Sequence, residues 1–308
     1  MKIRKAIVTA AGWGTRFLPA TKAQPKEMLP LVDKPIIQYV VEEAVASGIE
    51  QIIIVTAGGK RAIEDHFDRS FELEAALEKK GDKALLERVR RISELADICY
   101  LRQKEQLGLG HAVLTPKDLI GDEAFAVILP DDVIESHTPC LKQMIDVYDR
   151  FRCSVVATER VESSEVEKYG IVEPRLIEER VYQILNVVEK PSPERAPSNL
   201  GIVGRYILTP QIFEVLENTP PGKGGEIQLT DGIQNLLQRQ AVYAYEFDGI
   251  RYDAGTPLGF LKASVEIAMR RTDIGDAFRR YLMSLCQEPC PNGLGLFQEA
   301  VNALGDRA

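Results

Sequence analysis

A loop near the N-terminus combines the residue types that bind polyphosphates. The segment 9–31 follows an apolar run and contains two glycines and three cationic side chains, namely Gly12, Gly14, Arg16, Lys22 and Lys26. Glycines let backbone N–H groups approach phosphate oxygens closely, and cations offset the charge of a nucleoside triphosphate. The segment therefore predicts a triphosphate-binding loop. The alternative is a glycine turn on a solvated basic loop.

This loop matches neither of the two common phosphate-binding motifs. A Walker loop requires the tripeptide Gly-Lys-Ser/Thr, which the chain lacks. A dinucleotide fingerprint requires a third glycine, where Phe17 stands. It also requires an acidic residue at the end of the second predicted strand, where the chain has Val55, Thr56 and Ala57. These differences disfavour a P-loop NTPase and an oxidoreductase with a Rossmann site.

Two adjacent carboxylates, Asp131 and Asp132, follow an apolar run that is typical of a buried strand. Carboxylate oxygens are the hard ligands that Mg²⁺ prefers in proteins. The pair therefore predicts a magnesium site, with a turn cap at the strand end as the alternative.

Glu189 and Lys190 follow another predicted strand, at 185–188. An ammonium can bind a phosphate while a neighbouring carboxylate accepts hydrogen bonds from sugar hydroxyls. The dipeptide is thus a candidate sugar-phosphate site. Without further support it is equally well explained as a surface ion pair, which contributes little stability.

Gln103 and Gly108 lie in a loop that follows a predicted strand. A glutamine amide offers a donor and an acceptor, which suits the N3 and O4 edge of uracil, and a glycine lets a base lie against the backbone. The loop is therefore a candidate pyrimidine site, with a solvated loop before a helix as the alternative. His111 in the same segment receives no role.

The first half of the chain alternates strand and helix patterns, which predicts a mostly parallel sheet with helices on both faces. The expected strands are 5–10, 51–56, 97–101 and 125–129, and the expected helices are 36–46, 61–67, 71–95 with a break at Gly81, and one that begins near Leu109. Ligands bind beyond the carboxyl ends of strands in such sheets. The loops at Gly12 and Asp131 both lie there.

From Cys153 onward the pattern changes to short alternating runs such as 181–188, with turns rich in Pro and Gly. This indicates an added, smaller β region that contributes a second substrate pocket. Helical patterns resume at 228–239 and 258–271, and the tail after Asp273 is expected to be a helix packed on the surface or on a partner subunit. The fold class is α/β, with a Rossmann-like mixed sheet.

Composition restricts the possible functions. The 308 residues carry a net charge of −8, which disfavours nonspecific nucleic-acid binding. The five cysteines are scattered and read as reduced thiols, with no spacing that suits a zinc site. No run of about 18 apolar residues occurs, and the N-terminus has no leader pattern. We expect a cytoplasmic protein with no membrane and no nucleic-acid partner.

The segments 12–19 and 25–30 resemble the sugar-nucleotidyltransferase signature Gly-x-Gly-Thr-Arg-x-x-Pro followed by Pro-Lys-x-x-x-Pro. Their longer form is similar to one branch, the bacterial UTP-glucose-1-phosphate uridylyltransferases. Matching motifs follow in order at 169–172, 189–191, 196–200, 204–206 and 224–231, so the resemblance spans roughly residues 3–272. Trp13 replaces the leucine usual in the branch, and Ala254 replaces a bulkier residue.

The resemblance implies a role for each matching residue, as follows. The catalytic residues would be Arg16, Lys26, Asp131 and Lys190; the nucleotide site would comprise Ala10, Ala11, Gly12, Gly14, Thr15, Gln103 and Gly108; the sugar phosphate would contact Gly170, Glu189, Lys190 and Glu226; and Asp131 and Asp253 would bind Mg²⁺. It also implies a single nucleotidyltransferase domain at 1–272. The nucleotide part is about 1–150, the sugar-phosphate part about 151–272, and 273–308 a helical tail.

The implied reaction is uridylyl transfer from UTP to glucose 1-phosphate, which gives UDP-glucose and pyrophosphate. A sugar phosphate is already an anionic nucleophile, so no general base is required. A dTTP- or CTP-dependent enzyme is an alternative, because sensing a single methyl group provides only about 1–3 kcal/mol. A catalytically inactive nucleotide-binding regulator is a second one. We also expect a homo-oligomer, either a dimer or a tetramer.

Overall fold

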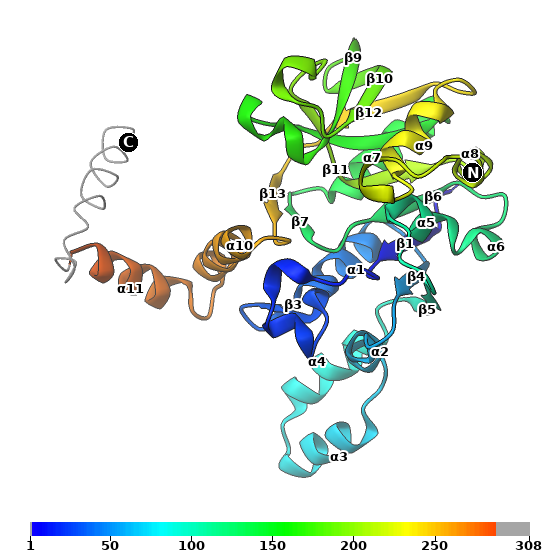
Figure 1. The fold of residues 1–308 in the computed structure, drawn as a ribbon. Coiled ribbons are helices and arrows are strands. Elements are labelled where there is room, and N and C mark those ends of the chain that lie inside the picture. Colours follow the sequence, from blue (N-terminus) through cyan, green and yellow to red (C-terminus); the bar gives the residue numbers. More distant parts are fainter. Residues whose placement is uncertain (1, 288–308) are drawn as a thin grey trace.

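The computed structural model describes residues 2–287, which are built around one nine-stranded mixed sheet in the order β5-β4-β1-β6-β11-β8-β12-β10-β9 (Figure 1). The strands of this sheet are β1 (Lys5–Thr9), β4 (Gln51–Thr56), β5 (Asp97–Arg102), β6 (Phe125–Ile128), β8 (Ser154–Arg160), β9 (Gly170–Glu178), β10 (Val181–Glu189), β11 (Leu200–Leu208) and β12 (Val242–Glu246). Two small sheets pair β7 (Asp132–Glu135) with β13 (Ile250–Asp253) and β2 (Pro30–Leu31) with β3 (Lys34–Pro35).

Eleven α-helices accompany the strands within the described residues. They are α1 (Ile36–Ala46), α2 (Arg61–Phe67), α3 (Phe71–Lys80), α4 (Lys83–Ser93), α5 (Leu109–Leu114), α6 (Lys117–Ile120), α7 (Cys140–Phe151), α8 (Gln211–Glu217), α9 (Leu229–Leu236), α10 (Pro257–Arg270) and α11 (Gly275–Gln287). Among them, no helix combines the length and apolar character needed to span a membrane.

The sheet changes from parallel to mixed along its width. The neighbours β5, β4, β1 and β6 are all parallel, whereas β11 runs antiparallel to both β6 and β8. Strand β12 is parallel to β8, and β10 and β9 complete the edge in antiparallel order. The α/β class with a mixed sheet is confirmed, and the strands of the second half extend the same sheet.

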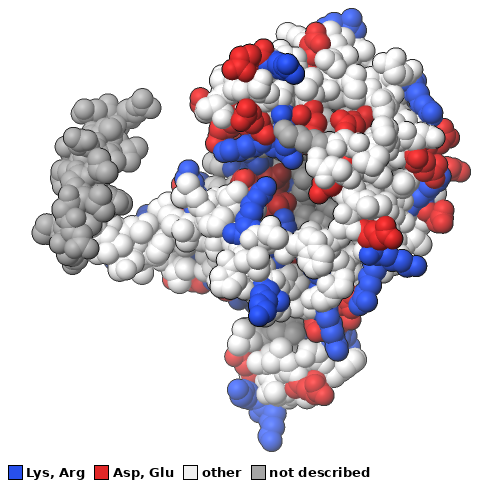
Figure 2. Space-filling model, in the orientation of Figure 1, with Lys and Arg blue, Asp and Glu red and all other residues white. Residues whose placement is uncertain are grey.

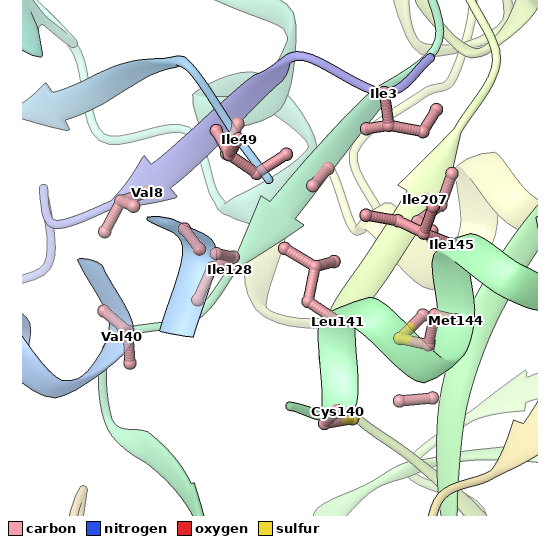
Figure 3. Packing of buried hydrophobic residues seen from close by; sticks show 14 of the residues in the cluster. Ile3, Val8, Val40, Ile49, Ile128, Cys140, Leu141, Met144, Ile145 and Ile207 are labelled. Carbon is pink, nitrogen blue, oxygen red and sulfur yellow. The ribbon is translucent and has the colours of Figure 1, made fainter. Parts of the chain in front are cut away.

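Helices cover both faces of the sheet because its central strands are buried on both sides. In β1, Ala6 and Val8 point to the face covered by α1 and α7, whereas Ile7 points to the face covered by α5, α8 and α9. Figure 3 shows residues of the first of these layers, including Val8 and Ile128 of the sheet and Leu141 of α7. The strands whose carboxyl ends lead into the predicted site loops are therefore packed between two layers of helices.

The pairing of β7 with β13 joins two segments that are far apart in the sequence. Asp253 lies opposite Asp132 in this antiparallel pair, and the Ala254 N–H donates to the Asp131 carbonyl oxygen at 2.8 Å. Two loops from distant parts of the sequence thus meet at the end of β6. The sequence patterns did not predict this small sheet, because two four-residue strands carry little periodicity.

Most predicted helices and strands agree with the structure to within one or two residues. α1 and β4 have the expected bounds, and the long helical pattern is divided between α3 and α4. The Asp82 carboxylate accepts from the Leu85 N–H and begins α4. Figure 1 shows α10 and α11 leading away from the sheet. The tail is helical over α11, and the rest of it lies outside the described residues.

Candidate active site

A cavity of about 560 Å³ opens where the carboxyl ends of β1, β5 and β6 meet, beside Thr9, Gln103 and Leu129. Ten predicted site residues line it, namely Ala11, Gly12, Gly14, Thr15, Arg16, Lys26, Gln103, Gly108, Asp131 and Glu226. Figure 2 shows a hollowed face where side chains of both charges gather. The cavity is therefore lined both by the predicted phosphate loop, residues 9–31, and by the loop of Gln103 and Gly108, which we call the base loop.

The loop after β1 divides its residues between two cavities. Ala10 is fully buried, and its N–H donates to the Val55 carbonyl oxygen at 2.8 Å, so it supports the loop from below. Lys22 lines a smaller neighbouring cavity of about 350 Å³ and not the larger one. The Trp13 side chain is 74% exposed and lines both. The structure therefore separates Lys22 from the other two cations of the loop.

Lys26 and Asp131 form an ion pair at the bottom of the larger cavity. Lys26 begins the 3₁₀ helix η3 (Lys26–Met28), and its Nζ lies 2.6 Å from Asp131 Oδ2. Burial alone would raise the pKa of Asp131, but the Lys26 ammonium more than offsets it and lowers that pKa below its ordinary value. Burial would likewise lower the pKa of Lys26, yet Asp131 and Glu27 raise it. The carboxylate is therefore held ionised.

The two carboxylates predicted to bind a metal converge at Gly255. A Cβ atom built on Gly255 would lie 2.7 Å from Asp131 Oδ2 and 3.0 Å from Asp253 Oδ1. Arg16 Nη1 also approaches the Gly255 carbonyl oxygen, at 3.5 Å. No cluster of three or more His, Cys, Asp or Glu ligands occurs in the part of the chain that is described. Two carboxylates suit Mg²⁺, which completes its coordination with waters and substrate phosphates.

A buried ion pair between Lys60 and Glu27 lies next to Lys26 in the structure. Lys60, at the start of α2, donates to Glu27 Oε2 at 2.7 Å, and both side chains are less than 10% exposed. Burial raises the pKa of Glu27, although Lys60 and Lys26 act against that shift. Because Glu27 follows Lys26 directly, this pair fixes the short helix that presents the ammonium. The sequence analysis missed both residues of the pair.

The base loop is clamped by the segment that carries Glu226. The Ile227 N–H donates to the Leu107 carbonyl oxygen at 2.7 Å, and the Gly110 N–H donates to the Ile227 carbonyl oxygen at 2.8 Å. Gly108 has a φ of +101°, and a Cβ there would lie 2.7 Å from the Cβ of Glu226. Glu226 therefore lies beside the predicted base site, and only glycine fits at 108.

Gln103 is 5% exposed, and its amide is already engaged within the protein. Its Nε2 donates to the Gly108 carbonyl oxygen at 3.3 Å and lies 2.8 Å from His111 Nδ1. His111, which received no role from the sequence, therefore contacts a predicted site residue directly. The signal that could have found it is its position one helical turn into the helix that begins after Gly108.

Gly170, Glu189 and Lys190 form a second group beyond the larger cavity. Gly170 and Glu189 are paired residues on β9 and β10, and Lys190 Nζ lies 3.2 Å from Glu189 Oε1. A Cβ on Gly170 would lie 2.9 Å from Thr230 Oγ1 at the start of α9. The predicted sugar-phosphate residues, apart from Glu226, are thus close together.

Arg251 connects this second group to the carboxylates. It donates to Asp132 Oδ1 at 2.6 Å, to Glu159 Oε2 at 2.7 Å and to the Tyr169 hydroxyl at 2.7 Å. Burial raises the pKa of Asp132 above its ordinary value, although Arg251 counteracts part of that shift. The sequence analysis considered this segment only for Asp253. Arg251 reaches Asp132 because β13 pairs with β7, and this pairing was not predicted.

Comparisons with known proteins agree with this geometry. A family model described as nucleotidyl transferase matches residues 5–270. A Bacillus subtilis protein named UTP–glucose-1-phosphate uridylyltransferase is 55% identical over 92% of this chain and 97% of its own length. A solved structure of a UDP-glucose pyrophosphorylase complexed with UDP-glucose aligns with a TM-score of 0.81 at 50% identity, over 87% of this chain and all of that one. A UTP-bound enzyme of the same name from Acinetobacter baumannii aligns with a TM-score of 0.86 at 43% identity, over 92% of this chain and 99% of that one.

Proposed function

Because this chain belongs to the nucleotidyl transferase family, and within it to the UTP–glucose-1-phosphate uridylyltransferases, we propose that it transfers the uridylyl group of UTP to glucose 1-phosphate. A phosphate oxygen of the sugar attacks the α-phosphorus of UTP, the bond from that phosphorus to the bridging oxygen of the β-phosphate breaks, and pyrophosphate leaves. The products are UDP-glucose and pyrophosphate. The main support for this proposal is that Lys26, Asp131 and Asp253 lie close together at one end of the phosphate loop.

Charge compensation is the main requirement of this reaction, because both reactants are anions. Lys26 and Arg16 stabilise the charge on the α-phosphate and on the departing pyrophosphate. Support comes from their positions, since both line the cavity and both lie beside Gly255 or Asp131. Gly12, Gly14 and Thr15 line the same cavity and offer backbone N–H groups to the triphosphate. The loop thus supplies donors where the charge develops.

We propose Asp131 and Asp253 as the ligands of Mg²⁺. When bound, the ion supplies Lewis-acid stabilisation to the phosphate oxygens of both reactants. The fit rests on two hard oxygen donors that converge at a glycine, the one residue type without a side chain to fill the space. The pKa of Asp131, lowered despite burial, keeps this carboxylate in the ionised form that a metal requires.

The sugar phosphate binds at the ends of β9 and β10 in this proposal. Lys190 orients the attacking phosphate, and Glu189 accepts hydrogen bonds from the sugar hydroxyls. A Cβ on Gly170 would meet the Thr230 hydroxyl, so Thr230 borders this site, and Arg251 connects the site to Asp132, next to the proposed metal ligand. Glu226 lines the cavity beside Gly108, and in this proposal its carboxylate accepts a hydrogen bond from a hydroxyl of the ribose or of the sugar.

The structure disfavours one of the two alternative functions, an inactive regulator, and is compatible with the other, the use of dTTP. An inactive regulator is disfavoured, because the full set of cations and carboxylates is present and converges. Use of dTTP is compatible with the cavity, since thymine offers the same hydrogen-bonding edge as uracil. UTP is preferred because the similar proteins carry UTP or UDP-glucose in their names and structures.

An assay of pyrophosphate release across four nucleoside triphosphates and several sugar 1-phosphates tests the proposal. We expect the highest kcat/KM for UTP with glucose 1-phosphate, in a strictly Mg²⁺-dependent reaction. The Asp131→Asn variant serves as the inactive control. Equal rates with all four nucleoside triphosphates, or pyrophosphate release without any sugar phosphate, would contradict the proposed uridylyl transfer.

We further propose that the chain forms a homo-oligomer. Large apolar side chains are exposed on α10 and α11, namely Leu258, Leu261, Tyr281, Met283 and Leu285. Burial of such side chains against a second copy is favourable, at roughly 25 cal/mol per Å² of apolar surface. Light scattering that gives the molar mass of one chain at micromolar concentration would contradict this. The cytoplasmic location stays a prediction.

A further inference from the structure

We propose that Trp13 binds the nucleoside part of the nucleotide, with its indole ring packed against the base and the ribose. Trp13 is the only tryptophan of the chain. Within residues 2–287, no other large hydrophobic side chain is as exposed. This role rests on the proposed uridylyl transfer, which places UTP in the larger cavity. It gives a function to a residue that differs from the leucine usual in the branch.

The indole of Trp13 has no polar or aromatic partner within residues 2–287. Its side chain takes part in no hydrogen bond, ion pair or ring contact there, so its N–H and most of its ring are open to a ligand. A single exposed hydrophobic residue needs no explanation on an open surface. Trp13, however, lines both the larger and the smaller cavity. Its exposed ring therefore belongs to the wall of the nucleotide site.

Hydrogen bonds fix the backbone on both sides of Trp13. Gln106 Nε2 donates to the Ala11 carbonyl oxygen at 2.9 Å, and the Thr21 hydroxyl donates to the Gly14 carbonyl oxygen at 2.8 Å. Gly14 has a φ of +66°, a conformation that glycine adopts readily. The indole thus projects from an anchored turn. Less backbone ordering then remains to be done when a ligand covers the ring.

The contacts on either side of Trp13 give the direction in which a nucleotide lies along the loop. On one side, Ala11 is bonded to Gln106, which belongs to the base loop. On the other side, Arg16 Nη1 lies 3.5 Å from the Gly255 carbonyl oxygen, beside the proposed metal ligands. A nucleotide with its base at the base loop and its phosphates at Arg16 therefore passes Trp13 with its nucleoside part.

An indole ring suits a nucleoside better than a polyphosphate. The face of the ring carries the negative part of its quadrupole, which disfavours contact with phosphate oxygens. Stacking of an aromatic side chain on a base is favourable for every base, because each base has a π-face. Trp13 therefore adds affinity for nucleotides without selecting among the pyrimidines.

Tryptophan fluorescence tests this role directly, because all emission of that type comes from Trp13. The wild type is titrated with UMP, UTP or inorganic pyrophosphate, with Mg²⁺ and without sugar phosphate. Excitation at the red edge of the tryptophan band avoids absorption by uracil. We expect UMP and UTP to shift the emission to shorter wavelength, and pyrophosphate to leave it unchanged. Unchanged emission when calorimetry shows that UTP binds, or an equal response to pyrophosphate, would overturn the inference.

Calorimetric titration of UMP into variants measures the contribution of the ring. Trp13→Leu should weaken binding roughly 10-fold, the effect of losing one stacked base. This variant should fold, because leucine is usual at that position in the branch. Trp13→Phe keeps a smaller ring and should stay within about 3-fold of the wild-type Kd. A wild-type Kd in Trp13→Leu would overturn the inference.

Phe71→Leu is the matched control for the loss of an exposed aromatic ring. Phe71 lies at the start of α3, is largely exposed and lines neither of the two cavities. Its variant should therefore bind UMP with the Kd of the wild type. An equal loss of affinity in Phe71→Leu and Trp13→Leu would show that the effect does not arise at the cavity, and would overturn the inference.

Steady-state kinetics tests whether the ring acts on every pyrimidine nucleotide. Trp13→Leu should lower kcat/KM for UTP and for dTTP by the same factor, mainly through a higher KM for the nucleotide, because the ring contacts no reacting atom. The KM for glucose 1-phosphate should stay at its wild-type value. A loss confined to UTP, or a loss expressed only in the KM for glucose 1-phosphate, would contradict this role.

Two other results separate this inference from its alternatives. If a second copy of the chain covered Trp13, the emission would change on dilution of the free protein and would not respond to UMP, which would overturn the inference. If the wild type bound UMP but made no UDP-glucose, the proposed function would fail, and fluorescence and calorimetry would still test Trp13. If UDP-glucose formed while Trp13→Leu bound UMP like the wild type, only the role of Trp13 would fail.

Discussion

Lys26 Nζ and Asp131 Oδ2 lie 2.6 Å apart, although their residues are 105 positions apart in the sequence. The side chains are 21% and 25% exposed, so neither charge is fully screened by water. Each shifts the pKa of the other in the direction that favours the charged form. The pair thus keeps a cation and a carboxylate anion, the proposed ligand of Mg²⁺, together at one point of the cavity.

Lys26→Met should lower kcat by about 100- to 1,000-fold, because its ammonium meets charge that develops in the transition state. The KM for UTP should change less, since other donors of the loop bind the ground state. Steady-state kinetics with varied UTP measures both effects. Lys22→Met is the matched control, because Lys22 lies on the same loop but lines the smaller cavity, and its kcat should stay near that of the wild type. A higher KM for UTP with an unchanged kcat would instead show that Lys26 contributes only to binding of the ground state.

Asp131→Asn should abolish most activity but leave the fold intact. The amide cannot supply the anionic ligand, so we expect at least a 100-fold loss of kcat, the size of one strong electrostatic contribution. Lys26 retains the nearby Glu27 carboxylate, so the free energy of unfolding should change by less than about 2 kcal/mol. Urea denaturation and kinetics measure the two quantities. In the wild type, EDTA should stop turnover and Mg²⁺ should restore it; full activity in excess chelator would exclude the metal.

Gly255→Ala should disturb both carboxylates at once. The new methyl group would lie 2.7 Å from Asp131 Oδ2 and 3.0 Å from Asp253 Oδ1, so at least one carboxylate must move. We expect a higher Mg²⁺ concentration for half-maximal activity and a lower kcat. Gly58→Ala is the control, because a Cβ there meets nothing within 4 Å and its backbone is unstrained. Equal metal dependence in the two variants would show that the carboxylates do not act together.

Arg251→Met should lower the free energy of unfolding by about 3–5 kcal/mol, because it leaves the buried Asp132 carboxylate without its cation. Burial already raises the pKa of Asp132, and loss of Arg251 raises it further. A raised folded-state pKa means stability that is present at low pH and lost as pH rises. The deficit should therefore be larger at pH 8 than at pH 5.

Urea denaturation of Arg251→Met at both pH values measures this dependence. Adding Asp132→Asn should recover part of the loss at pH 8, because the buried charge is then removed. The asparagine oxygen can still accept from the Gly204 N–H, which donates to Asp132 Oδ2 at 2.8 Å. Equal deficits at the two pH values would indicate that lost packing, and not the carboxylate, explains the change.

The sequence predicted the parts of the site that lie within short segments. Gly12, Arg16 and Lys26 belong to one loop, and Asp131 follows an obvious apolar strand, so spacing alone indicated their chemistry. The meeting of Asp253 with Asp131 was implied by the resemblance and not by periodicity. It depends on the pairing of β7 with β13, two strands too short to give a pattern.

The residues that the sequence could not identify act through other side chains. Lys60 pairs with Glu27 behind the phosphate loop, Arg251 spans three elements, and His111 faces Gln103. Each is an ordinary polar residue in its own segment, and its role exists only once distant elements are packed together. A single sequence carries no record of such partners.

A labelling experiment tests the central claim most directly. The enzyme is incubated with Mg²⁺, glucose 1-phosphate and UTP that is labelled in separate samples at the α- or the γ-phosphorus, and the products are separated. Attack at the α-phosphorus predicts that the α-label appears in UDP-glucose and the γ-label in pyrophosphate, with neither transfer in Asp131→Asn. Release of γ-label as inorganic phosphate, or α-label that stays in UTP while sugar phosphate is in excess, would contradict uridylyl transfer.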